Sequence, residues 1–275
     1  LNLVELWLDA NVLTGTIPSD IGNSTLLQIF QVGYNFLTGT LPTSLTSLRF
    51  METLFLQSNN FVGSIDNLFD PATQERIKYI DISDNSFSGS LPGNQFSSNS
   101  SLVSFAAATN CFSGSLPSQI CQVDSLVDLV LDGASSASRC QQLIFGSNSF
   151  FKSASPSTYE TAEKPRLSKA FVLKHKLTNG IPPCLFNISR LEILHLSGNA
   201  LTGTIPYDVV VTPTLLNLSI ANNQLSGPIP LTIQQKSFVN LDVSYNKFSG
   251  TLASDVPAVV ANGSFRALRN RLSGN

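Results

Sequence analysis

The sequence predicts a solenoid, in which one short structural unit is stacked many times along a single axis. The main observation is the line Asn11–Pro18, which returns 24 residues later as Asn35–Pro42. Further copies begin at Asn59, Asn85, Asn110, Asn199, Asn223 and Asn246. A period of 23 to 26 residues is typical of repeat architectures, whose units bury their apolar faces only against their neighbours. The chain has room for about ten to eleven units, and we expect one continuous domain over residues 1–275.

Each unit is predicted to begin with a short strand. Apolar residues stand eight, five and three positions before each Asn, as Leu3, Leu6 and Leu8 stand before Asn11. A period of two indicates a strand with one buried face. Strands of successive units are expected to pair in parallel at about 4.8 Å, forming an inner sheet along the whole solenoid.

The rest of the unit consists of turn signals. The Asn amide can donate and accept, so a column of Asn side chains can satisfy buried turn groups from one coil to the next. The glycine at Gly15 permits backbone angles that a side chain forbids. The Ile17-Pro18 pair buries one apolar side chain and then ends strand pairing, because proline has no donor.

These residues carry a family resemblance. The stretch Leu194–Pro206, L-H-L-S-G-N-A-L-T-G-T-I-P, resembles the plant-type leucine-rich repeat, and the match covers Leu3–Asp132 and Leu167–Gly250. The resemblance implies a leucine-rich repeat solenoid, a curved α/β-type superhelix with an inner parallel β-sheet and short strands or 3₁₀ turns outside. It also implies an extracellular setting, in receptor-like kinases, receptor-like proteins or secreted inhibitors of wall-degrading enzymes. No kinase motif occurs in this segment.

The repeat is interrupted between Leu126 and Leu167. Ala134 takes the place of the turn Asn, and a stretch rich in Ser, Lys, Glu and Pro follows. We interpret residues 133–166 as a degenerate repeat with an insertion, after which a normal coil resumes at Leu167. Two interpretations stay open, a loop spilled from one face and an island that shapes a ligand site, because long irregular loops are usually either disordered or functional.

All four cysteines lie in or beside this interruption. An even, clustered count favours disulfides formed in an oxidising compartment. The short loop between Cys121 and Cys140 makes that pair the favoured bridge, while Cys111 and Cys184 either pair with each other or stay free.

Other signals agree with an extracellular or cell-surface location. Sequons at Asn23, Asn99 and Asn187 follow the Ile-Pro segments, on the outer side of the coil, and are the candidate glycosylation sites; two more, at Asn217 and Asn262, are weaker. The chain opens and stops inside a repeat, which suggests a fragment of a longer ectodomain. No apolar run approaches the length of a membrane span.

Composition and motifs argue against several functions. A net charge of −2 with 16 basic and 18 acidic residues does not suit nucleic acid or an anionic membrane. No hydrolase, metalloprotease or phosphate-binding motif occurs, so we expect no enzyme activity and no cofactor. Neither the cysteines nor the two histidines have metal-ligand spacing, so we expect no metal site.

Candidate ligand contacts come from the strand position that faces solvent. In a strand, the residue between the last two buried Leu positions points away from the core. That column reads Trp7, Gln31, Phe55, Asp81, Ala106, Val130, Phe171, His195, Ser219 and Asp242, and adjacent places add Asp9, Tyr34, Gln57, Tyr79, Asp84, Lys174 and Tyr245. Exposed aromatic residues are unusual on a solvated sheet and are enriched in binding hot spots. We therefore expect ligand binding by Trp7, Gln31, Tyr34, Phe55, Gln57, Asp81, Phe171 and His195, with Trp7, Tyr34 and Phe55 as the central patch.

Three functional hypotheses fit these patterns. The first is a recognition module of a receptor-like or secreted protein that binds a protein, peptide or glycan through its inner face. The alternatives are a structural or adhesive matrix scaffold, and an inhibitor of an extracellular hydrolase.

Overall fold

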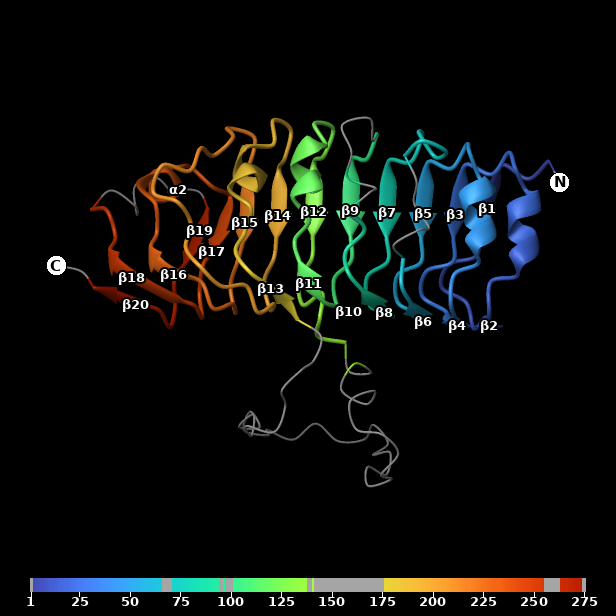
Figure 1. The fold of residues 1–275 in the computed structure, drawn as a ribbon, viewed down its shortest axis with the longest axis horizontal. Coiled ribbons are helices and arrows are strands. Elements are labelled where there is room, and N and C mark those ends of the chain that lie inside the picture. Colours follow the sequence, from blue (N-terminus) through green and yellow to red (C-terminus); the bar gives the residue numbers. More distant parts are fainter. Residues whose placement is uncertain are drawn as a thin grey trace, which may run out of the picture.

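The structure is a computed structural model and describes residues 2–65, 71–93, 96, 101–137, 140, 176–254 and 263–273. It confirms the leucine-rich-repeat solenoid (Figure 1). Ten strands form the inner parallel sheet in sequence order, so nine coils separate them. They are β1 (Glu5–Trp7), β3 (Ile29–Gln31), β5 (Thr53–Phe55), β7 (Tyr79–Asp81), β9 (Ser104–Ala106), β12 (Asp128–Val130), β14 (Ile193–His195), β15 (Asn217–Ser219), β17 (Asn240–Asp242) and β19 (Ser264–Arg266).

A second row of short strands follows the turn of each coil. One group comprises β2 (Thr14–Gly15), β4 (Phe36–Gly39), β6 (Asn60–Gly63), β8 (Ser86–Gly89) and β10 (Cys111–Phe112). The row continues with the pair β11 (Gly114–Ser115) and β13 (Leu177–Thr178), then with β16 (Ser226–Pro228), β18 (Lys247–Thr251) and β20 (Arg271–Ser273). All of these pairings are parallel.

Short helices complete the coils after the Ile-Pro segments. Among the described residues these are the 3₁₀ helices η1 (Ser19–Asn23), η2 (Thr43–Ser47), η4 (Ser118–Gln122) and η5 (Pro183–Asn187), and the single α-turn α2 (Leu231–Gln234). Each is preceded by a proline, such as Pro18 before η1, whose fixed φ suits the start of a helix. No helix in the described part of the chain is long and apolar enough to cross a membrane.

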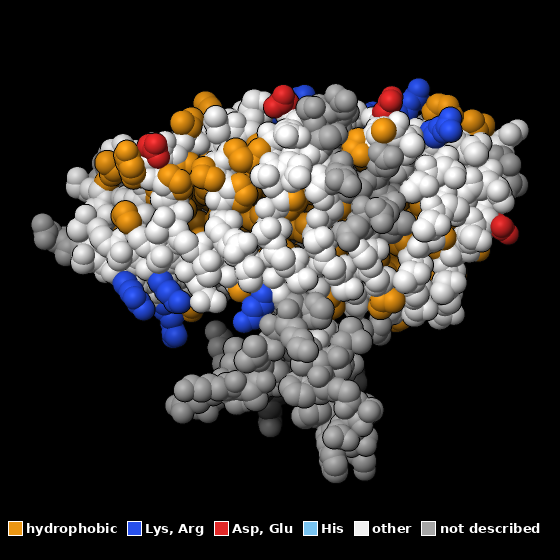
Figure 2. Space-filling view, in the orientation of Figure 1, with side chains coloured by type: hydrophobic (Ala, Val, Ile, Leu, Met, Phe, Trp, Pro, Cys, Tyr) orange, Lys and Arg blue, Asp and Glu red, His pale blue; other side chains and the backbone are white. Residues whose placement is uncertain are grey.

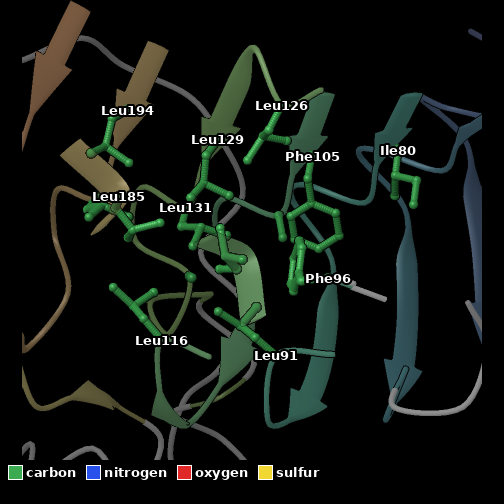
Figure 3. Packing of buried hydrophobic residues seen from close by; sticks show 14 of the residues in the cluster. Ile80, Leu91, Phe96, Phe105, Leu116, Leu126, Leu129, Leu131, Leu185 and Leu194 are labelled. Carbon is green, nitrogen blue, oxygen red and sulfur yellow. The ribbon is translucent and has the colours of Figure 1, made fainter. Parts of the chain in front are cut away.

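The core lies between these rows and runs without a break along the solenoid. The apolar side chains of the inner strands point into it, as Leu129, Leu194 and Phe105 do in Figure 3. Phe105 meets Phe96 edge-on with 5.3 Å between ring centroids. Because each coil buries its apolar residues only against the next, the repeat pattern alone determines this architecture.

A ladder of Asn side chains fixes the turn after each inner strand. Asn59 shows the pattern: its Oδ1 accepts the Leu37 N–H at 2.9 Å, and its Nδ2 donates to the Val32 carbonyl at 2.9 Å. The same arrangement recurs at Asn35, Asn85, Asn110, Asn223, Asn246 and Asn270. The predicted role of the Asn column is therefore confirmed, since it satisfies turn groups of two neighbouring coils.

The turn glycine has a steric reason as well as a conformational one. Gly39 has φ +77°, and a Cβ added there would lie 2.7 Å from the Thr16 Cγ2 of the preceding coil. Coils at this corner are therefore packed too closely for a side chain.

The ladder is broken at the predicted interruption. Ala134 stands in the place of the Asn, and the next residue, Ser135, partly substitutes for the missing amides: its Oγ accepts the Leu177 N–H at 2.9 Å and donates to the Phe112 carbonyl at 2.6 Å. The next rung is incomplete in consequence, because Asn199 Oδ1 has no hydrogen-bond partner among the described residues. Ser135 and Leu177 thus occupy adjacent places in one coil, and 41 residues, 136–176, lie between them.

This register corrects one expectation about the interruption. β12 pairs directly with β14, with Asp128 opposite Ile193, so no inner strand stands between them at the position predicted around Phe171. The coil that starts at Leu126 is completed by the motif Leu177–Pro182, and only these two flanks are described. The apolar spacing of Leu167, Ala170 and Val172 imitates a strand. The assignment of 133–166 as a degenerate repeat with insertion stays a prediction.

Candidate ligand-binding face

Three columns of side chains cover the solvent side of the inner sheet, which we call the inner-sheet face. The first column holds the first residue of each strand and the second column holds the third. The third column lies two residues beyond, where Asp9, Gln57 and Asp132 stand. Neighbouring strands align residue for residue, so Trp7, Gln31 and Phe55 are consecutive members of the second column. Each column therefore presents one side chain about every 4.8 Å.

Aromatic side chains stand on the first coils of this face. Trp7 is 59% exposed and Tyr79 is 40% exposed, while Phe55 is half-buried between its neighbours. The Trp7 indole N–H donates to Glu5 Oε2 at 3.0 Å, which fixes the ring at the strand. The structure thus places Trp7 and Phe55 on the predicted face, separated by one strand, with Tyr79 near them in the first column.

Tyr34 lies at the edge of this patch. It stands one residue past the third column, at a turn position with φ +54°, and is 58% exposed. Its N–H donates to the Gln57 carbonyl at 2.8 Å, which holds the turn against the next coil. Tyr34 is therefore available to a ligand from the rim of the sheet.

The predicted polar contacts occupy the same coils. Gln57 lies against Gly33, where an added Cβ would be 2.8 Å from its Cδ, and Gln57 Oε1 is buried with no partner among the described residues. Asp81 Oδ1 accepts the Ser83 N–H at 2.9 Å, which leaves its second oxygen available for a ligand. Gln31 is half-buried between the two aromatic residues of the second column.

His195 lies farther along the face, beside two carboxylates. Its Nδ1 is 3.5 Å from Asp132 Oδ2, while Asp132 Oδ1 accepts the Ser197 N–H at 2.6 Å. Desolvation raises the pKa of the Asp128 carboxyl above its usual value, against the opposing hydrogen bond from Ser104. This group is separated from the aromatic patch by the small residues Ala106 and Ala108 of the β9 coil.

Phe171 was also predicted to belong to the second column, between Val130 and His195. Val130 and His195 are direct neighbours in the sheet, and the column ends at Arg266 on β19. Phe171 itself lies outside the described residues. The predicted column ended at Asp242, one strand before Arg266, because the last repeat is only partly present in the sequence.

The disulfide prediction also needs correction. The bridges are Cys111–Cys140 and Cys121–Cys184, so Cys121 does not pair with Cys140. Cys121 and Cys184 belong to η4 and η5, which are successive outer helices despite a sequence separation of 63. After Ser135 the chain passes back over Asn110, whose carbonyl accepts the Ala137 N–H at 3.0 Å, and this brings Cys140 to Cys111. Stacking of coils, rather than loop length, sets both pairs.

Two of the three candidate glycosylation sites are accessible. Asn23 and Asn187 are exposed and each forms the last residue of an outer 3₁₀ helix, η1 and η5 respectively. Asn99 lies outside the described residues. A glycan at Asn23 or Asn187 would leave the inner-sheet face unobstructed.

The side chains of this face are suited to non-covalent binding of a partner. Within the described ranges, no group of three or more His, Cys, Asp or Glu side chains could hold a metal ion. The exposed groups are aromatic rings, amides and carboxylates, which recognise a partner by apolar contact, hydrogen bonds and charge.

Comparison with known proteins shows which proteins the chain resembles. The Leucine Rich Repeat family model matches residues 2–24, 76–99 and 190–210. Receptor-like protein 18 of Arabidopsis thaliana is 28% identical over 212 residues, covering 74% of this chain and 22% of that protein. Receptor-like protein 35 of the same plant is 31% identical over 227 residues, covering 66% of this chain and 23% of that protein. The chain thus spans less than a quarter of the length of these relatives.

A solved structure shows the same fold. The plant peptide hormone receptor RGFR1, in complex with RGF2, matches 99% of this chain with a TM-score of 0.74 and 26% identity, over 37% of its own length. The chain therefore has the leucine-rich-repeat fold and is similar to the receptor-like proteins of Arabidopsis thaliana.

Proposed function

We propose that this chain is an extracellular or cell-surface recognition module that binds a peptide or protein segment across the first coils of its inner-sheet face. The observation that carries the proposal is the exposure of Trp7, Tyr34 and Tyr79 beside Phe55 on a rigid sheet. Aromatic anchors of this kind account for much of the energy of protein interfaces. The similarity to a peptide hormone receptor and to receptor-like proteins supports this function, and the two disulfides support an oxidising compartment.

The inner sheet can bind a ligand without a prior change in its own conformation. Each anchor is held by strand pairing and by the Asn ladder beneath it, so little ordering entropy is lost on binding. Gln31, Gln57 and Asp81 provide hydrogen-bonding groups between and beside the rings. His195, on β14, would contact only a ligand that extends past the β9 coil.

The test is a selection of random displayed peptides on the folded protein, followed by affinity measurements on purified variants. Phe55→Ala and Trp7→Ala should each weaken the selected peptides by about thirtyfold, since losing a central anchor costs about 2 kcal/mol. Tyr207→Ala is the matched control, because Tyr207 is 84% exposed but lies on the outer side, after the Ile205-Pro206 segment.

Phe112→Ala provides the folding reference. Phe112 is fully buried, so this variant should lose several kcal/mol of stability, whereas Phe55→Ala should keep nearly all of it. If the selected peptides bind Phe55→Ala, Trp7→Ala and the unchanged protein equally well, the aromatic patch is not the binding site.

A further inference from the structure

The charged residues of the inner-sheet face are unevenly distributed. Over the seven strands from β1 to β14, its three columns carry five carboxylates and no Lys or Arg; the acids are Glu5, Asp9, Asp81, Asp128 and Asp132. In these columns, His195 is the one side chain that can carry positive charge. Asp84 adds a sixth carboxylate at the rim, at an exposed turn position with φ +53°. This face is therefore acidic over most of its length.

Positive charge lies elsewhere in the described structure. Figure 2 shows Lys and Arg side chains gathered along the edge where β18 and β20 lie in Figure 1, and this part of the chain carries Lys247, Arg269 and Arg271. On the inner-sheet face the first arginine is Arg266, on the last strand. No described Lys or Arg forms a salt bridge with Asp81, Asp128 or Asp132.

Carboxylates and aromatic rings occupy the same and neighbouring strands of the face. Phe55 is the direct neighbour of Asp81, and Tyr79 belongs to the same strand as Asp81. Asp128 and Asp132 then stand on the far side of Ala106 and Ala108, two strand spacings or about 10 Å from Asp81. Aromatic rings and carboxylates together stabilise Lys and Arg side chains, through the ring quadrupole and through direct charge attraction.

From this arrangement we infer that the partner of the inner-sheet face is an extended basic peptide, whose Lys or Arg side chains lie over Asp81, Asp128 and Asp132 and whose apolar residues lie on Phe55 and Tyr79. The inference rests on the proposed function and specifies the class of ligand. The seven strands span about 29 Å, the length of about nine extended residues. Acidic charge on the receptor side also attracts such a peptide before contact, so association slows as salt increases.

The chain contains a competing occupant. Residues 136–176 hold seven basic and two acidic residues, a net charge of +5, whereas the rest of the chain holds nine basic and 16 acidic residues, a net charge of −7. The experiment therefore has to separate a free basic peptide from this segment of the same chain.

The probes are synthetic peptides of about ten residues that share the same aromatic and aliphatic positions and differ in net charge from about −4 to about +4, measured by calorimetry at about 0.05 M and about 0.5 M salt. We expect the basic peptide to bind at least about tenfold more tightly than the neutral one at low salt, and the difference to shrink at high salt. The triple variant Asp81→Asn, Asp128→Asn, Asp132→Asn should lose that tenfold preference.

The matched control changes the same net charge elsewhere. Asp20→Asn, Asp124→Asn, Asp208→Asn removes three exposed carboxylates that lie outside the inner-sheet columns, and it should keep the preference for the basic peptide. If both triple variants lose the preference equally, net charge rather than this face causes it, and the inference is wrong.

Two other outcomes are distinguishable. If peptides of every charge bind equally and Phe55→Ala weakens them all, the basic-ligand inference fails and the proposed function stands; if no peptide binding depends on Phe55, the proposed function fails. The variant Lys164→Gln, Arg166→Gln, Lys169→Gln, Lys174→Gln tests the competing occupant. An increase of more than about tenfold in basic-peptide affinity there would show that residues 136–176 occupy the face, and would overturn the inference of a separate peptide.

Discussion

At the scale of single residues, the Asn ladder explains how a chain with little charge stabilises so many turns. Only 12% of the residues are charged, and the turn groups are satisfied by amides instead. Asn223 illustrates the full rung: Oδ1 accepts the Leu201 N–H at 3.1 Å, and Nδ2 donates to the carbonyls of Leu196, Ile220 and Ala221. Each rung thereby ties its own coil to the preceding one.

The rungs should differ measurably in energy. Asn223→Ala leaves a buried N–H and several carbonyls unpaired, which should cost roughly 1 to 3 kcal/mol. Asn199→Ala should cost less, about 1 kcal/mol, because Asn199 uses only its Nδ2 and its Oδ1 is already without a partner among the described residues. Asn240→Ala, at an exposed site on β17, should stay within about 0.5 kcal/mol. Urea unfolding measures the three values, and a loss at Asn240 as large as at Asn223 would contradict the assigned roles.

The sequence predicted the positions of the Asn rungs, but it did not predict how the turn is stabilised where the Asn is missing. The spacing of the Leu positions and the turn Asn identified every other rung before Asn270. At the gap, Ser135 supplies a hydroxyl that both donates and accepts, a substitution that no periodic pattern can reveal. The repeat resumes at Leu177, but the sequence pattern placed this point earlier, because Leu167–Leu173 has the apolar spacing of an inner strand. Local patterns specify which residues are able to form a strand, but pairing with β12 is available to only one segment.

At the scale of elements, the outer helices and the insertion determine the disulfides. Cys121 and Cys184 stand on consecutive helices, with 5.7 Å between their Cα atoms. The sequence predicted the cysteines' oxidation but not their partners, because partner choice depends on which coil follows η4. That information is non-local, and 41 residues separate the two halves of the intervening coil.

Peptide mapping under non-reducing conditions tests the pairing directly. Trypsin is unsuitable, because residues 79–138 contain no Lys or Arg and Cys111 and Cys121 stay in one fragment. Chymotrypsin cleaves after Phe112 and separates them. We expect the linked fragments Cys111 with Cys140 and Cys121 with Cys184. A fragment that links Cys121 to Cys140 would contradict the stacking of η4 on η5.

At the scale of the whole molecule, the two disulfides tie the β12 coil, where the Asn ladder is interrupted, to the β9 coil before it. In a solenoid each coil contacts only its neighbours, so stability is close to a sum of coil and interface contributions. The rung at Asn199, between the β12 coil and the β14 coil, is incomplete, and the bridge Cys121–Cys184 joins the β12 coil to the β9 coil on its other side. By the loop-entropy estimate, bridges over 29 and 63 residues stabilise by roughly 4 kcal/mol each. The solenoid is therefore expected to behave as one unit only while the bridges are intact.

Replacing all four cysteines by serine should divide the unfolding of the molecule into two steps. Trp7 is the only tryptophan and belongs to the first coil, so its fluorescence reports the N-terminal coils, whereas far-UV circular dichroism reports all of them. In the oxidised protein the two signals should change together over one urea transition. In the variant the inner strands up to β9 and those from β14 onward are coupled only through the coil of β12, and we expect the two signals to have different midpoints. Coincident transitions in the variant would show that the continuous core couples the two halves without help from the disulfides.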